Sequence, residues 1–160
     1  MWGLLAGIAL FFGATFRAGH TWGDDFAMYL LHARNLAEGL PYAATGYVYN
    51  PQEPHLGPPV SPPVFPLLLA PVYAALGLNL TAFKTVVLVC FVLYLAMVYA
   101  ILAPYLAPRW RWAAVALLGL QPYFWDFKDA ILSDIPGLLF TACAVWLVQT
   151  GLPAGSLSKA

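Results

Sequence analysis

Charged residues are scarce in this sequence, and their scarcity excludes an ordinary soluble domain. Asp, Glu, Lys and Arg together make up 9% of the 160 residues, whereas 62% are hydrophobic. A soluble globular domain carries about a quarter charged residues, which cover its surface. Because so few charges cannot cover so much apolar surface, we expect lipid to be the solvent for much of the chain.

The chain also lacks an excess of either charge sign and has few cysteines. Seven basic and seven acidic residues give a formal net charge of zero, so we expect no nucleic-acid partner. Cys90 and Cys143 both lie inside apolar runs. We interpret them as small core or lipid-facing residues rather than as a disulfide or a pair of metal ligands.

Long apolar runs are what the sequence has in abundance. Four of them, 2–17, 83–106, 112–125 and 130–149, approach the length of about 20 apolar residues that a membrane-spanning helix needs. The first run lacks the basic start and the clean cleavage site of a signal peptide, so we expect an uncleaved anchor. The third run is short and depends on flanking Trp and Tyr residues as interfacial anchors.

A fifth apolar run, 62–78, leaves two topologies open. It contains Pro66 and Pro71, which remove backbone hydrogen-bond donors, although membrane helices tolerate proline. If the run crosses the bilayer, Arg109 and Arg111 lie outside. If it only dips into the outer leaflet, both arginines lie inside and most acidic residues lie outside. The positive-inside rule favours this second arrangement.

The expected fold class is therefore an all-α, polytopic membrane protein. About four transmembrane helices would be joined by juxtamembrane helices in a long first outer loop, about 18–82. The N-terminus and the basic turn would lie inside, and a short segment, about 126–134, would lie outside. We expect residues 1–160 to form a single membrane domain in the cell membrane, with its active face periplasmic or extracellular.

Two adjacent acids, Asp24 and Asp25, stand at the start of a predicted helix in the first outer loop. Asp24 is a good N-cap, Asp25 favours the first turn through the helix dipole, and Gly39 is a typical stop, so the pattern predicts a helix over 25–38. The plain interpretation of the pair is a helix cap. Ionisable groups at the lipid boundary are costly and tend to be functional, so the pair is also a candidate general base.

A second group of charged residues, Asp126, Lys128, Asp129 and Asp134, precedes the last apolar run. The first three match a solvated loop that flanks the membrane. Asp134 differs because it enters an apolar run, where a carboxylate is costly. We expect it to need a partner, such as Lys128, Arg34 or a bound phosphate or metal group.

In order and spacing, these features resemble the N-terminal part of GT-C glycosyltransferases, especially the branch of protein O-mannosyltransferases and aminoarabinose transferases. The acid pair leads into a helix that contains Tyr29 and ends at Gly39. A proline-led apolar helix ends in Gly-x-Asn, here PPVFPLLLAPVYAALGLN, and Ser133-Asp134-Ile135-Pro136 enters a later span. The resemblance covers most of the chain.

The resemblance implies a membrane enzyme that moves a sugar from a polyprenyl-phosphate carrier to an acceptor hydroxyl on a protein, lipid or glycan, with inversion. Asp24 would be the general base, and Asp25 would support it or contact the acceptor. Four further side chains would contact the substrate: Asp134, Lys128, Arg34 and Tyr29. Such enzymes have many more spans, so we expect these residues to be the N-terminal part of a longer enzyme, and activity of this part alone is in doubt.

Two alternatives concern metal binding and the class of protein. Glu53 and His55 could bind a metal, but two residues are too few to define a site, so we assign no metal ligand and keep a divalent metal only as a possible cofactor. The alternative to an enzyme is a non-enzymatic membrane protein, either a transporter fragment or an assembly partner. A transporter would place ionisable groups near the middle of its spans, and 83–106 and 112–125 have none in their interior.

Overall fold

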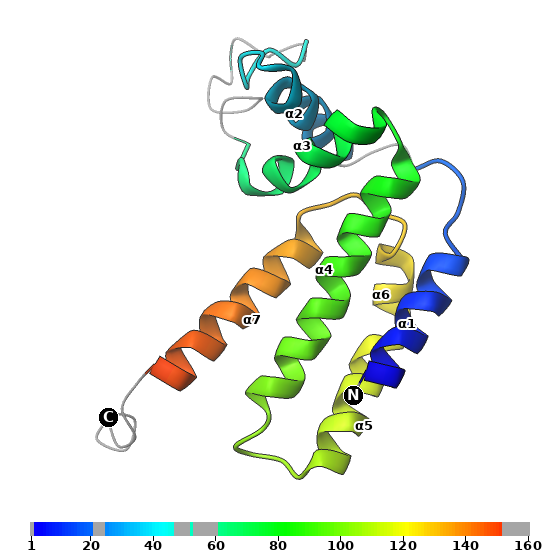
Figure 1. Ribbon diagram of the computed structural model, residues 1–160, viewed down its shortest axis with the longest axis vertical. Coiled ribbons are helices and arrows are strands. Elements are labelled where there is room, and N and C mark those ends of the chain that lie inside the picture. Colours follow the sequence, from blue (N-terminus) through cyan, green and yellow to red (C-terminus); the bar gives the residue numbers. More distant parts are fainter. Residues whose placement is uncertain (1, 21–24, 47–51, 53–60, 152–160) are drawn as a thin grey trace. The chain divides into compact units, whose positions relative to one another are not determined.

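The computed structural model describes residues 2–20, 25–46, 52 and 61–151. Among these residues there are seven helices and no strand, which confirms the all-α prediction (Figure 1). The chain divides into two compact units. The first unit comprises Met1–Thr15, Leu88–Lys128 and Asp134–Ala160, and the second comprises Phe16–Val87 and Asp129–Ser133.

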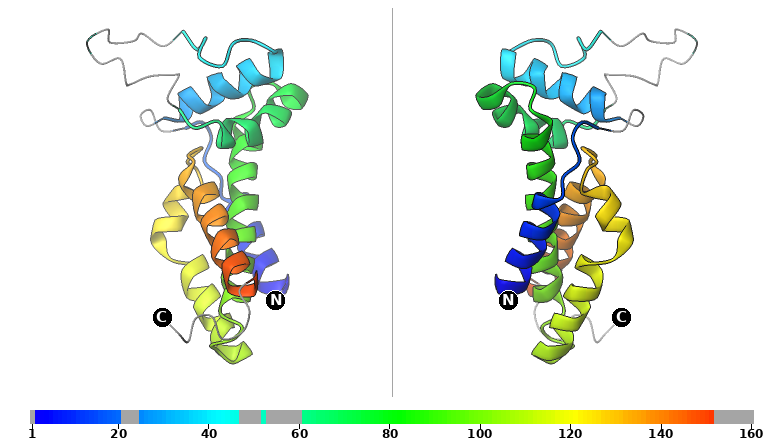
Figure 2. Two further views of the ribbon diagram at one scale, coloured as in Figure 1. Left: turned by 90° about the vertical axis from the view of Figure 1, so that its left-hand side faces the viewer. Right: turned by 90° about the vertical axis from the view of Figure 1, so that its right-hand side faces the viewer.

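The second unit is built on two helices, α2 (Phe26–Glu38) and α3 (Val64–Leu76), which pack against each other (Figure 2). α2 ends at Gly39 as predicted, because the residue has a φ of 69°, a conformation that glycine adopts without strain. α3 tolerates Pro66 because the first turn of a helix has no intrahelical partner for its N–H groups. The buried side chains of Tyr29 and Phe65 join the two helices.

The first unit contains α1 (Trp2–Ala14), most of α4 (Leu80–Ile101), α5 (Pro108–Gly119), α6 (Pro122–Phe127) and α7 (Asp134–Gly151). Its core is aromatic: Phe91 lies 5.6 Å from Phe12 and 4.8 Å from Phe124, measured between ring centroids. Gly119 permits a close approach, since a Cβ there would lie 2.7 Å from Cδ1 of Ile8. Both cysteines are free.

The apolar run 112–125 does not form one helix, which corrects the prediction of a single span there. α5 ends at Gly119 and α6 begins at Pro122. Proline has no N–H to continue the hydrogen-bond ladder, and it forces the residue before it out of the helical region. Gln121 accordingly has a ψ of 145°, and its side chain caps α6 by accepting a hydrogen bond from the Tyr123 N–H.

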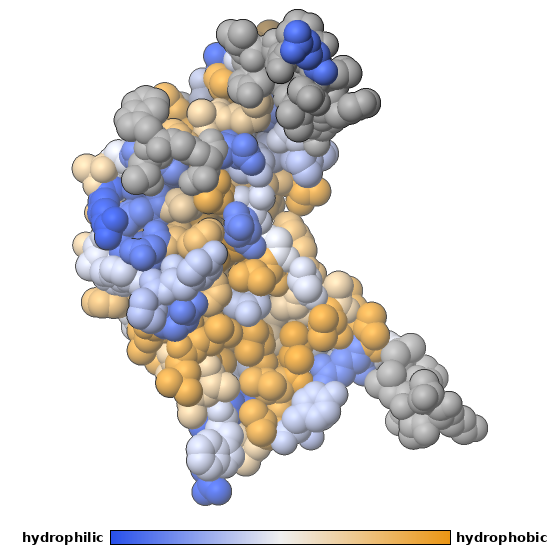
Figure 3. Space-filling model, turned by 180° about the vertical axis from the view of Figure 1, so that it is seen from behind, coloured by the Kyte–Doolittle hydropathy of each residue, from blue (hydrophilic) through white to orange (hydrophobic). Residues whose placement is uncertain are grey.

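One helix in the described part of the chain, α4, is long and apolar enough to cross a membrane. Its 22 residues extend for about 33 Å, close to the thickness of a bilayer core. α1 and α3 are apolar but shorter. Large hydrophobic side chains are exposed on the helices of the first unit, and Figure 3 shows them over much of its surface. The topology of about four spans stays a prediction.

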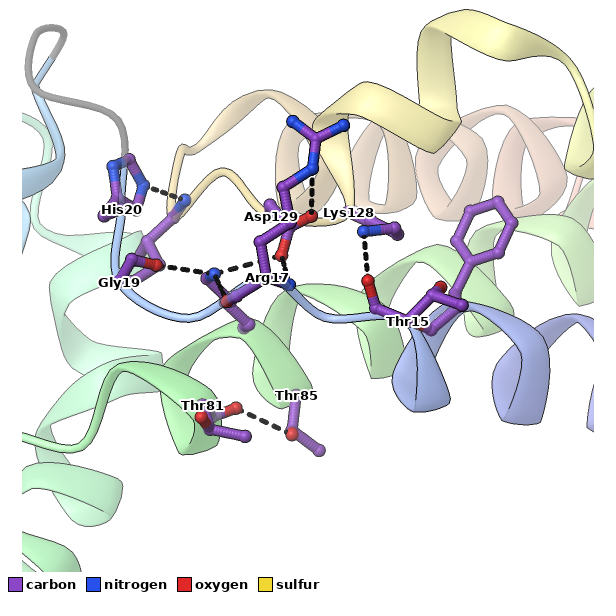
Figure 4. A network of polar contacts seen from close by, with 11 residues as sticks. Thr15, Arg17, Gly19, His20, Thr81, Thr85, Lys128 and Asp129 are labelled. Atoms are coloured by element: carbon purple, nitrogen blue, oxygen red, sulfur yellow. Dashed lines mark hydrogen bonds and ion pairs between the residues drawn. The ribbon is translucent and has the colours of Figure 1, made fainter.

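A buried lysine organises the polar part of the second unit, and Figure 4 labels its partners Arg17, Gly19 and Asp129. Lys84 is 1% exposed, and its ammonium donates to the carbonyls of Arg17 and Gly19 at 2.8 and 2.7 Å and to the Asp129 carboxylate at 3.0 Å. The N–H of Arg17 donates to the same carboxylate at 2.8 Å. All three ammonium protons are therefore satisfied, as a buried cation requires.

We expect Lys84→Met to lower the free energy of unfolding by about 3 kcal/mol, because it removes the buried ammonium from Asp129 and from the carbonyls of Arg17 and Gly19. Thermal unfolding of the full chain in detergent micelles, followed by circular dichroism, measures the change. Thr85→Ala is the matched control, since Thr85 is an exposed neighbour on the same helix and should change stability by less than about 0.5 kcal/mol. Equal stabilities of the two variants would contradict the role given to Lys84.

Candidate functional site

A hydrogen bond joins two of the sequence features that carry the resemblance. The hydroxyl groups of Tyr29, on α2, and Ser133, in the segment before α7, lie 3.0 Å apart. These residues are 104 positions apart in the sequence. Tyr29 is buried, and its ring meets that of Phe65 edge to face at 5.1 Å, so packing against α3 orients the hydroxyl toward Ser133.

Asp25 stands immediately before α2 and is exposed. Its carbonyl accepts the Tyr29 N–H at 3.1 Å, but its side chain makes no capping hydrogen bond. The carboxylate therefore does not serve as a cap and is open to solvent. It lies at the N-terminal end of α2, next to the first turn.

The C-terminal half of α2 holds the following turn through buried polar side chains. His32 is fully buried, stacks on Tyr42 at 3.9 Å, and its Nδ1 donates to the Tyr42 carbonyl at 2.8 Å. The amide of Asn35, also fully buried, donates to the carbonyls of Pro41 and Tyr42. In the described residues, His32 Nε2 is buried without a hydrogen-bond partner. These bonds fix the chain that leaves α2.

Tyr42 acts in this arrangement as a hydrogen-bond donor. Burial raises the pKa of its hydroxyl above 10.0, and the nearby Tyr29 raises it further, whereas a hydrogen bond with Ser61 opposes the shift. The hydroxyl donates to the Ser61 carbonyl at 2.9 Å. Because it stays protonated near neutral pH, Tyr42 is not a candidate base, and the carboxylate of Asp25 is the better one.

Arg34 lies on α2 but not beside Asp25. Nine residues separate them, which corresponds to about 13 Å along the helix axis and exceeds hydrogen-bond reach. The Nη2 group of Arg34 donates to the Asn35 side chain at 3.2 Å, and among the described residues its buried Nε has no acceptor. One phosphate oxygen could therefore not contact both Arg34 and Asp25.

Sequence reasoning missed the polar residues that hold the segment before Ser133. The N–H of Ile131 donates to Nε2 of His20 at 2.9 Å, and the His20 ring stacks on Phe26 at 3.8 Å. Lys84 and Asp129 hold the start of the same segment. A lysine at the head of an apolar run was a signal that a buried partner must exist.

Two of the predicted substrate-binding residues belong to the first unit. Asp134 is the first residue of α7 and is exposed, and a carboxylate in this position interacts favourably with the helix dipole. Lys128 is 4% exposed, donates to the Thr15 carbonyl at 2.7 Å, and its ammonium lies 4.7 Å from the centroid of the Trp125 ring. Its ammonium is thus engaged at the end of α1.

Several predicted residues lie outside the described part of the chain. They are the expected base Asp24 and the weak metal candidates Glu53 and His55. Among the described residues, no group of three His, Cys, Asp or Glu side chains could hold a metal ion.

Comparisons with protein-family models, with curated proteins and with solved structures found no match. The resemblance to GT-C glycosyltransferases therefore stays a prediction from the sequence.

The hydrogen bond between Tyr29 and Ser133 should appear as a coupling energy of about 1 kcal/mol. The free energy of unfolding is measured for Tyr29→Phe, Ser133→Ala and the double variant. The effects should not add, because either single change already breaks the bond. Pairing Ser133→Ala with Thr85→Ala serves as the control and should be additive. Additive effects for Tyr29 and Ser133 would show that the bond does not contribute to stability.

Proposed function

We propose that this chain is the N-terminal module of a GT-C-like membrane glycosyltransferase. The observation that supports the proposal most is the hydrogen bond between Tyr29 and Ser133. It joins the helix that follows the acid pair to the Ser-Asp-x-Pro segment, and both features carry the resemblance to GT-C glycosyltransferases.

The proposed reaction moves a sugar from a polyprenyl-phosphate carrier to an acceptor hydroxyl. A hydroxyl is a weak nucleophile until a carboxylate takes its proton. The carboxylate of Asp25 is exposed and makes no capping hydrogen bond to α2. The resemblance assigns that step to Asp24 and a supporting role to Asp25. The oxygen of the acceptor then bonds to the anomeric carbon, while the carbon–oxygen bond to the carrier phosphate breaks and the phosphate leaves with the electron pair.

The departing phosphate needs cationic partners. Arg34 and Lys128 are the candidates proposed for that role, together with Tyr29 and Asp134 as further substrate contacts. Arg34 is the better candidate of the two, because its buried Nε has no acceptor among the described residues. A phosphate oxygen would satisfy that donor. Lys128 already donates to a carbonyl and would have to exchange it for phosphate.

We expect Asp25→Asn to reduce sugar transfer, and Asp24→Asn to reduce it more, by about 100- to 10,000-fold for the residue that acts as the base. The assay follows labelled mannose from synthetic undecaprenyl-phosphate mannose into membrane acceptors, using the complete gene product in nanodiscs. Glu38→Gln is the matched control, since Glu38 is an exposed acid at the opposite end of α2. Full transfer by both Asp variants would refute the base assignment. Failure of the wild-type protein to bind undecaprenyl phosphate would favour a non-enzymatic assembly partner.

The proposed topology has about four spans, with the turn between α4 and α5 inside and the first loop outside. In a Cys90→Ala, Cys143→Ala background, a cysteine in place of Arg109 should be shielded from an impermeant thiol reagent in intact cells. Ala44→Cys and Asp126→Cys should be labelled, because both positions are exposed and lie on the proposed outer side. Labelling at position 109 with none at position 126 would overturn this topology.

A further inference from the structure

The end of α4, the start of α5 and the turn between them carry a group of basic and aromatic side chains, which we call the basic–aromatic cluster: Tyr99, Tyr105, Arg109, Trp110, Arg111 and Trp112. The Arg111 guanidinium lies 4.5 Å from the centroid of the Tyr99 ring, and Arg109 lies 5.6 Å from that of Trp110. The rings of Tyr99 and Trp112 are 5.1 Å apart. The two cations are therefore held by aromatic faces within one unit.

No acidic side chain compensates these two arginines. The sequence has no Asp or Glu between Glu53 and Asp126, and in the described part of the chain neither guanidinium forms an ion pair. Both arginines also stand in the first turn and a half of α5, where the helix dipole is positive, and the N-cap residue, Ala107, has no side chain that could neutralise it. An anion that approaches the first turn of α5 would offset this repulsion.

One donor in the cluster is left unsatisfied. The Nε of Arg111 is shielded from solvent and has no hydrogen-bond partner in the residues that the structure describes. A buried donor without an acceptor is unfavourable, and a guanidinium has the fork geometry that matches phosphate oxygens. The cluster therefore lacks an acceptor with negative charge.

Two rings of the cluster and two leucines near it in the sequence are exposed. Tyr105 is 69% exposed, Trp110 is 57% exposed, and Leu106 and Leu117 are exposed as well. Trp and Tyr rings of this kind are enriched at the level of lipid headgroups, where one end of the ring is wet and the other is apolar. A free phosphate ion would leave these side chains in water, whereas a phospholipid would cover them with its acyl chains.

We propose that the basic–aromatic cluster binds the headgroup phosphate of an anionic phospholipid. The phosphate lies against Arg109 and Arg111, and the acyl chains contact the exposed rings and leucines beside them. Juxtamembrane arginines attract anionic lipids through charge, and the aromatic side chains set the depth of the headgroup. The cluster shares no residue with the acid pair or with Arg34, so the proposal does not depend on sugar transfer.

Native mass spectrometry of the purified full chain in detergent tests the proposal, with phosphatidylglycerol and phosphatidylcholine of identical acyl chains as probes. The wild-type chain should retain phosphatidylglycerol in preference to phosphatidylcholine. Arg109→Gln and Arg111→Gln should each weaken phosphatidylglycerol binding about fivefold, and the double variant about 25-fold. Arg17→Gln, which removes an exposed arginine outside the cluster, is the matched control and should bind like the wild type.

Two further measurements need no variant. Raising the salt concentration from about 50 to 500 mM should weaken phosphatidylglycerol binding to the wild type, because it screens charge. Inorganic phosphate should compete only weakly, because it lacks acyl chains. Equal retention of the two lipids, binding that is insensitive to salt, or a double variant that binds like the wild type would overturn the proposal. Inorganic phosphate that binds as tightly as phosphatidylglycerol would overturn the lipid as the source of the phosphate.

Discussion

The burial of the Lys84 ammonium is the constraint on which the second unit depends. A cation withdrawn from water must find an acceptor for each proton, and here the acceptors come from the segment after α1 and from the segment before α7. Those two segments are thereby tied to the start of α4. The same tie brings Ile131 to His20 and Ser133 to Tyr29, so the candidate site follows from the packing of one lysine.

Most of the helices could be predicted because apolar runs, and the residues that begin and end helices, are local properties of the sequence. Gly39 ends α2 through its own backbone conformation, and Asp134 opens α7 where the apolar run begins. The run 112–125 was misjudged because hydropathy was given more weight than Pro122. The proline changes the backbone of Gln121 whatever the hydropathy of its neighbours, and two helices result.

The candidate site was harder to predict, because its contacts join residues far apart in the sequence. The motif order singled out Tyr29 and the Ser-Asp-x-Pro segment, but no sequence rule pairs two hydroxyls across 104 residues. The sequence shows Lys84 only as a charge near the start of an apolar run, whereas its burial is what identifies Asp129 as structural. Long-range partners of this kind become visible only when the packing is known.

Two lysines and two arginines of the chain make different kinds of contact. Lys84 and Lys128 are buried, and their compact ammonium groups donate to backbone carbonyls of the segment that follows α1. Arg109 and Arg111 lie against aromatic faces, without an ion pair in the part of the chain that the structure describes. A planar guanidinium stacks on a ring and still offers two parallel N–H groups along its edge to an anion. Among these four residues, the two lysines donate to internal carbonyls, whereas Arg109 and Arg111 keep a positive charge that the proposed lipid phosphate would meet.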